Sequence, residues 1–162
     1  MKMEIERKLQ VLGLALPEPL QAPQGVQLPF AQVRVHTDRA YISGHAPLNT
    51  DGTLREPLGK VGAEVSPEEG YQAARATALA VLGSIKRELG DLDRVTGWLR
   101  VFGMVNVAPG FTNTPAVING FSDLILELYG PNIGRHARSA VGMAELPFRI
   151  PVEIEAEIAI QS

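Results

Sequence analysis

Residues 150–160 alternate strictly between apolar side chains and polar or small ones. Successive side chains of a β-strand point to opposite faces of the sheet, so this run predicts a strand with one buried face and with Glu153, Glu155 and Glu157 on the other. Carboxylates are costly to place in a dry core. The acidic face must therefore meet water, a partner subunit or a ligand pocket, and a sheet left uncovered on one face tends to oligomerise. The positions predicted to point inward are Ile150, Val152, Ile154, Ala156, Ile158 and Ile160.

Two long helices are predicted, and each begins with a capping residue followed by proline. In Ser66–Glu69, serine caps the helix, proline fits its first turn and Glu69 completes a capping box. An apolar face continues along the segment until Gly90, which ends it. Thr114–Pro115 begins a second helix in the same way, and Gly130–Pro131 is predicted to stop it.

Five segments have the composition of strands. Phe30–His36 and Ala40–Gly44 are separated by turn residues and predict a hairpin, Val95–Val107 predicts a strand between the helices, and Ala137–Ala144 with Ile150–Ile160 predicts a second hairpin. The resulting order is β-β-α-β-α-β-β. It indicates an α/β (α+β) fold with a mixed sheet and both helices on one face.

The first 24 residues are expected to form a short amphipathic helix and a Pro-rich linker, with the main domain spanning residues 25–162. Charged residues at positions 4, 6, 7 and 8 stand where a signal peptide needs an apolar core. No run approaches the roughly 18 consecutive apolar residues of a membrane span. We therefore expect a cytoplasmic protein without a membrane partner.

Composition excludes several kinds of chemistry. The chain of 162 residues has a net charge of −3, which disfavours nucleic acid as a partner. It contains no cysteine, so a thiolate nucleophile and a cysteine-bound zinc are excluded. His36, His45 and His136 share no metal-binding spacing, so neither a metal nor another cofactor is predicted. Ser122 follows a glycine but lacks the second glycine of a hydrolase elbow.

Arg138 is the most suggestive candidate for binding. A guanidinium among very small neighbours leaves a hollow that suits a carboxylate ligand. Glu153 is predicted on the other arm of the same hairpin, where it could act as a general acid or base, or accept a hydrogen bond from water. The alternative is a cross-strand salt bridge between the two residues, without chemistry. Strand alternation places on one side Arg138, Ala140, Gly142 and Ala144.

Three other polar or small positions allow two interpretations each. His136 could shuttle protons, but a histidine beside an arginine at the start of a strand is more often a solvated or hydrogen-bonded rim residue. Asn119 is either an exposed amide or a ligand contact on its helix. Gly44 either ends a strand or lets a ligand approach the backbone closely.

Several motifs, in order and spacing, resemble the RidA family, also called YjgF-like or L-PSP proteins, over residues 26 to 160. The resemblance implies a chorismate-mutase-like fold, a homotrimer with ligand sites between subunits, and hydrolysis of enamines or imines to 2-keto acids and ammonia without a cofactor. The segments that carry it are Ala40–Pro47, Gly90–Val95, the helix around Asn119, His136–Ser139, Leu146–Pro147 and Val152–Ala156.

The same resemblance assigns roles to individual residues. Arg138 matches the arginine that binds the substrate carboxylate, and Glu153 matches the glutamate that positions or activates water. Further matches to pocket positions are Ser43, Gly44 and Asn119.

Two pocket positions depart from the family pattern. Ala140 stands where many members have cysteine, and Phe30 stands where deaminating members often have tyrosine. The expected function is therefore an imine deaminase, with a non-catalytic protein that binds or senses a small carboxylate as the alternative. Endoribonuclease activity, a name given to similar larger members, ranks lower because the chain is acidic.

Overall fold

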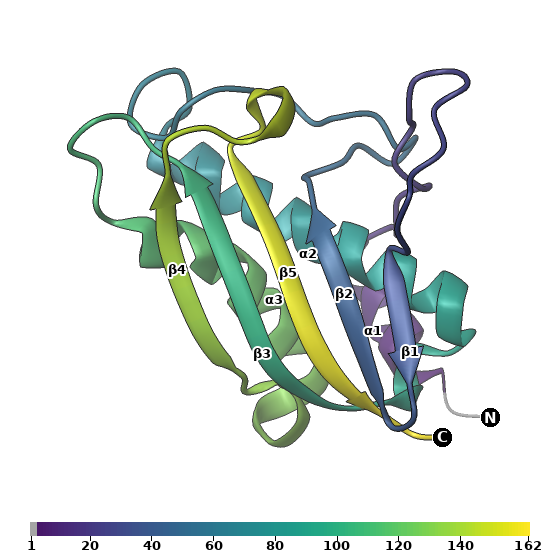
Figure 1. The fold of residues 1–162 in the computed structure, drawn as a ribbon. Helices are drawn as coiled ribbons and strands as arrows, with labels where there is room; N and C mark the ends of the chain where they lie inside the picture. The colour runs from purple at the N-terminus through teal and green to yellow at the C-terminus, as the bar shows by residue number, and fades with distance from the viewer. Residues whose placement is uncertain (1–2) are drawn as a thin grey trace.

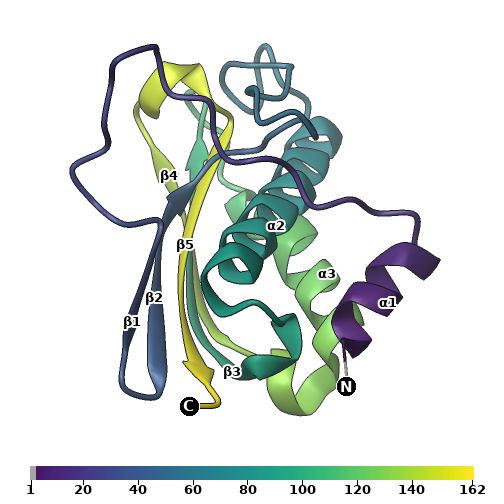
Figure 2. The ribbon, with the colours of Figure 1, turned by 90° about the vertical axis from the view of Figure 1, so that its right-hand side faces the viewer.

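The computed structural model describes residues 3–162, in which one five-stranded sheet carries two long helices on one face (Figure 1). Figure 2 shows α2 and α3 side by side on that face, while the other face is uncovered. The predicted order of strands and helices is confirmed, as is the mixed α+β class. The elements are α1 Glu4–Val11, β1 Val33–His36, β2 Arg39–His45, α2 Pro67–Leu89, β3 Val95–Asn106, α3 Thr114–Gly134, β4 Ala137–Met143 and β5 Val152–Ile160, with 3-10 turns at Leu92–Arg94 (η1) and Pro147–Arg149 (η2).

The strands lie in the order β1-β2-β5-β3-β4. β5 is antiparallel to both β2 and β3, whereas β4 is parallel to β3 and forms the edge of the sheet. The predicted second hairpin is therefore wrong, because β3 separates β4 from β5. The physical reason is that α3 acts as a crossover, which returns the chain parallel to β3 on its outer side. The strongly alternating β5 then takes the central place, where its apolar side is covered along its whole length.

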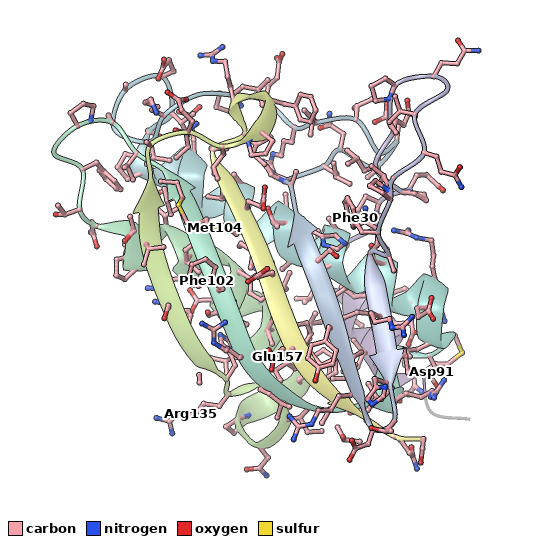
Figure 3. The ribbon with its side chains drawn as sticks, in the orientation of Figure 1. Phe30, Asp91, Phe102, Met104, Arg135 and Glu157 are labelled. Carbon is pink, nitrogen blue, oxygen red and sulfur yellow. The ribbon has the colours of Figure 1, made fainter. Side chains whose placement is uncertain are left out.

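The core lies between the sheet and the two helices. The inward residues of β5 are buried as predicted, and Glu155 on the opposite face is exposed. Trp98 of β3 packs edge-on against Phe121 of α3, with ring centroids 6.0 Å apart. Figure 3 shows the uncovered face, to which Phe102, Met104 and Glu157 project. This face therefore combines apolar and acidic side chains.

The start of α2 is capped as predicted. The Glu69 amide donates to Ser66 Oγ at 3.0 Å, and the Ser66 amide donates to Glu69 Oε1 at 3.0 Å. Gly90 ends the helix with a φ of 82°. The predicted stop at Gly130–Pro131 is confirmed in that the backbone of Gly130 leaves the helical range, with a φ of 72° and a ψ of 176°. Pro131 then begins a short new helical segment, which extends α3 to Gly134.

The N-terminal segment is fastened to the main body at several points. Asp93 in η1 accepts hydrogen bonds from the amides of Glu4 and Ile5, at 2.8 and 3.0 Å. Ile5 and Leu9 join the main core. The following segment, residues 12–32, crosses α2 as an extended strap (Figure 2). Within residues 3–162, no helix combines the length and apolar character needed to cross a membrane.

Close packing of α2 on α3 generates the first prediction. A Cβ added to Gly120 would clash with the Tyr71 carbonyl, whose carbon would lie 2.9 Å away. We expect Gly120→Ala to lower the free energy of unfolding by about 1–3 kcal/mol, because the two backbones must separate. Urea unfolding measures this. Gly97→Ala is the control, since its new Cβ would meet its nearest neighbour at an ordinary 3.6 Å. Equal stabilities of the two variants would contradict the prediction.

Candidate functional site

Arg138 projects from β4 toward the helices. Its register partner Val101 is fully buried on the helix side of the sheet. Arg138 Nη1 donates to Asn119 Oδ1 at 2.8 Å and to Ser122 Oγ at 3.1 Å, and Nη2 approaches the Pro115 carbonyl at 3.5 Å. The structure thus brings together Arg138 and Asn119, two of the predicted site residues, at the edge of the sheet.

The guanidinium of Arg138 is held by neutral oxygens. Among residues 3–162, no carboxylate lies within ion-pair distance of it, so the predicted alternative of a salt bridge to Glu153 is wrong within one chain. Further along the same side of β4, Val107 packs against Gly142, with a methyl carbon 2.9 Å from where a Cβ would stand. Ala140 is half-buried, and its carbonyl accepts a hydrogen bond from the Thr114 hydroxyl at 3.0 Å. Arg138 therefore offers an unpaired, partly exposed positive charge.

Glu153 lies on the uncovered face of the sheet, over Gly44. A Cβ on Gly44 would stand 2.9 Å from Glu153 Cδ, so a larger residue at this position would displace the carboxylate from its present place. The register of β2 with β5 shifts between Ile42 and His45, at a bulge that includes Gly44. Burial raises the pKa of Glu153, and the charge of Glu155 raises it further. Gly44 thus lets the side chain of Glu153, from the same chain, come close to the backbone.

Ser43 and Phe30 lie near the same bulge. Ser43 Oγ donates to the Ala31 carbonyl at 2.7 Å, and its amide donates to the Gln32 carbonyl at 2.9 Å. The predicted strand start at Phe30 is wrong, because the regular pairing of β1 with β2 begins only at Val33. Phe30 precedes the strand and its side chain is 54% exposed (Figure 3). The bonds of Ser43 thus lie on the β1 side of β2, whereas the bulge interrupts the pairing of β2 with β5.

The candidate residues therefore form two groups on opposite faces of the sheet. Arg138 and Asn119 lie on the helix side, whereas Glu153 and Gly44 lie on the uncovered side, with β3 between β4 and β5. The predicted proximity of Arg138 and Glu153 depended on a hairpin that does not form. One site could use both residues only if they came from different copies of the chain.

His136 makes two hydrogen bonds and is half-buried rather than solvated. Its Nδ1 lies 2.8 Å from the Gly134 carbonyl, and its Nε2 lies 2.8 Å from Ser122 Oγ. Burial lowers its pKa, and the charge of Arg138 lowers it further against the opposing effect of the Gly134 carbonyl. Ser122 was not predicted as a site residue, although it lies one helical turn after Asn119 and so shares a face with it.

A second buried histidine lies beneath the Gly44 bulge. His45 Nδ1 lies 2.5 Å from the Ser43 carbonyl, and its Nε2 lies 2.8 Å from Ser84 Oγ. Arg87 donates to the same Ser84 Oγ at 3.1 Å and to the Pro17 carbonyl at 3.1 Å. Burial is the main cause that lowers the pKa of His45. Ser84 and Arg87 share a helix face by their spacing, but no spacing connects them to His45.

One group of three acidic residues gathers in residues 3–162. Ligand atoms of Glu6, Asp91 and Asp93 lie within 4.8 Å of one another. Asp93 already accepts two amides of α1, and Lys86 Nζ contacts Glu6 Oε1 at 2.8 Å. These contacts fasten α1 to η1, and they provide a structural reason for the cluster.

The buried His45 generates a prediction about pH. Because its folded pKa lies below the ordinary 6.5, the unfolded chain binds the proton more readily. Its contribution to stability is full above pH 6.5 and is lost as the pH falls through the lowered folded value. We expect His45→Asn to unfold with about 1–3 kcal/mol less free energy at pH 8 and with a weaker loss on acidification. Thermal unfolding between pH 8 and 5 measures both.

The exposed His36 provides the control for this experiment. His36→Asn should leave the pH dependence of the unfolding temperature as in the unsubstituted chain, because that side chain is exposed. An unchanged pH dependence in His45→Asn would contradict the prediction.

Comparison with known proteins gives a consistent result. Residues 6–150 match the family described as "YjgF/chorismate_mutase-like, putative endoribonuclease". Protein TCP17 of Trypanosoma cruzi is 39% identical over 159 residues, which cover 98% of this chain and 95% of TCP17.

Two solved structures share the fold over nearly their whole length. Protein Atu1372 of Agrobacterium tumefaciens, of unknown function, is 34% identical with a TM-score of 0.86, covering 99% of this chain and 95% of that one. A "putative endoribonuclease" of Shewanella oneidensis is 28% identical with a TM-score of 0.85, covering 96% and 99%. The predicted resemblance to RidA and YjgF proteins is thereby confirmed, and the chain belongs to the YjgF/chorismate-mutase-like family.

Proposed function

We propose that the protein hydrolyses 2-imino acids to 2-keto acids and ammonia, at a site formed between two copies of the chain. The observation that carries this proposal is the unpaired guanidinium of Arg138, held in place by Asn119 and Ser122. A fixed guanidinium without an anionic partner suits a small carboxylate, which it can bind through two parallel hydrogen bonds. Membership of the family, whose RidA members the sequence resembles, supports the same ligand class.

Glu153 is the proposed proton carrier. Its raised pKa brings it closer to neutral pH, where a general base is most effective. Water adds to the imine carbon, and Glu153 takes the proton that this water loses. Glu153 then returns this proton to the nitrogen, which gives a carbinolamine. Glu153 next takes the proton of the carbinolamine hydroxyl and passes it to the amino nitrogen, so that the carbon–nitrogen bond breaks, ammonia leaves and the hydroxyl oxygen becomes the keto oxygen. An imine is already electrophilic, so orientation and one proton carrier suffice.

Two copies are needed because Arg138 and Glu153 lie on opposite faces of one sheet. β4 has a free edge, and the uncovered face carries Phe102 and Met104, which are only partly buried in one copy (Figure 3). Partly exposed apolar side chains favour association. We propose the homotrimer implied by the RidA resemblance, in which Arg138 of one copy faces the uncovered sheet of another.

A second candidate function is binding of a small carboxylate without turnover. Phe30 provides no hydroxyl and Ala140 no thiol, so two polar groups common in deaminating relatives are absent from these positions. The two functions share Arg138 and differ in the need for Glu153. Ribonuclease activity, named for the Shewanella relative, is less favoured because a net charge of −3 gives no general attraction to phosphates.

Removal of the guanidinium tests the carboxylate site. An amino-acid oxidase can generate 2-iminopropanoate in place, and formation of pyruvate can then be timed. We expect Arg138→Ala to lower kcat/KM by about 100-fold, because truncating one partner of a charged pair typically has that effect. Arg135→Ala is the matched control, since Arg135 is exposed and lies just before β4 (Figure 3). Equal rates for both variants would exclude Arg138 from the site.

Mixing two inactive variants tests whether the site lies between copies. Arg138→Ala and Glu153→Gln should each be inactive alone. In mixed oligomers, about a quarter of the interfaces should pair an intact Arg138 with an intact Glu153 and regain activity. If mass spectrometry shows that mixed oligomers form and activity still does not recover, Arg138 and Glu153 do not act together across the interface. Binding of pyruvate without any imine turnover by the unsubstituted protein would support the second candidate function.

A further inference from the structure

Three side chains and one carbonyl form a continuous chain of hydrogen bonds behind Arg138. Arg138 Nη1 lies 3.1 Å from Ser122 Oγ, which lies 2.8 Å from His136 Nε2. His136 Nδ1 lies 2.8 Å from the Gly134 carbonyl. These hydrogen bonds connect the start of β4 to the middle and to the end of α3.

The chemistry of its ends fixes the direction of every bond in this chain. The Gly134 carbonyl can only accept, so His136 Nδ1 carries a hydrogen and donates it. In the neutral ring Nε2 is then an acceptor, and the Ser122 hydroxyl must donate to it. The guanidinium can only donate, so Ser122 Oγ accepts from Arg138. Neutral His136 therefore turns the oxygen lone pairs of Ser122 toward Arg138.

The surroundings favour the neutral ring. Burial lowers the pKa of His136, and the charge of Arg138, two residues further along at the start of β4, lowers it as well. A protonated ring would direct a second cationic donor at the oxygen that already accepts from Arg138. The neutral ring, which accepts a hydrogen bond from Ser122, is therefore the form compatible with the bond from Arg138 to Ser122.

We propose that His136 is a positioning residue, which acts through the Ser122 hydroxyl to hold Arg138 in the orientation that binds the substrate carboxylate. The role rests on the proposed function, because it is defined by carboxylate binding at Arg138. It adds His136 and Ser122 to the site as groups that do not touch the ligand. Their effect depends on Arg138.

The His45 chain shows what a purely structural version looks like. It has the same sequence of contacts, from Arg87 through Ser84 and His45 to the Ser43 carbonyl. Its arginine ends on the Pro17 carbonyl of the N-terminal strap. Neither arginine has an ion-pair partner within residues 3–162, and the two chains differ in place: the guanidinium of Arg138 lies on the edge strand β4, whereas that of Arg87 is bonded to the N-terminal strap.

Calorimetric binding of pyruvate, the keto acid product used as an inert probe, tests the proposal. We expect His136→Ala and Ser122→Ala each to weaken binding by about 5- to 10-fold, as expected for coupled neighbours. His136→Gln should restore it to within about 2-fold, because the amide oxygen can accept from Ser122 as Nε2 does. In an Arg138→Ala background, His136→Ala should have no further effect. His36→Ala, at an exposed histidine, is the matched control and should bind normally.

The outcomes separate this role from a structural one. If His136→Ala and His136→Gln weaken binding equally, or if His136→Ala still weakens it without Arg138, the positioning role is overturned. If Arg138→Ala weakens binding but His136→Ala and Ser122→Ala do not, only this inference fails. If Arg138→Ala binds pyruvate normally, the proposed carboxylate site itself fails. Ser122→Ala removes a single oxygen, so it remains informative should His136→Ala fold poorly.

Discussion

The central position of β5 determines how the rest of the molecule is arranged. Its apolar side is buried beneath α2 and α3, and its acidic side faces outward along the same strand. Because β5 pairs with both β2 and β3, β4 is left at the edge. The guanidinium of Arg138 and the carboxylate of Glu153 are thereby directed to opposite faces. The strand whose apolar side fills the centre of the core thus also carries Glu153 on the face opposite to Arg138.

Local patterns predicted local structure well. The two-residue alternation identified β5, and the Ser66 capping box identified the start of α2, because both depend on neighbouring residues in the chain. The order of strands was not predicted, since the short loop between β4 and β5 suggested a hairpin and nothing in either strand records that β3 lies between them. Gly130–Pro131 interrupts α3 as predicted, but the short helical segment after it was not predicted, although proline is compatible with the first turn of a new helix.

The sequence suggested candidate site residues, but it did not predict how they are arranged. Arg138 and Asn119 do meet, and Gly44 does admit a close approach. Ser122 and Ser84 were missed, because their hydrogen bonds to the distant His136 and His45 leave no fixed spacing in the sequence. Helical spacing could have linked Ser122 to Asn119 and Arg87 to Ser84, but it does not show which histidine each serine meets. The family resemblance therefore identified candidate residues, and only the fold showed the hydrogen bonds between them.

The strap that follows α1 has a practical meaning for protein engineering. The Glu18 amide donates to the Thr50 carbonyl, the Arg87 guanidinium reaches the Pro17 carbonyl, and Gly52 leaves no space for a side chain beside the Pro19 carbonyl. Residues 17–21 are thus bonded to two separate parts of the main body. A fluorescent label or an affinity sequence inserted among them would displace these bonds, whereas the exposed turn at Gln24 and Gly25 offers a tolerant point of insertion.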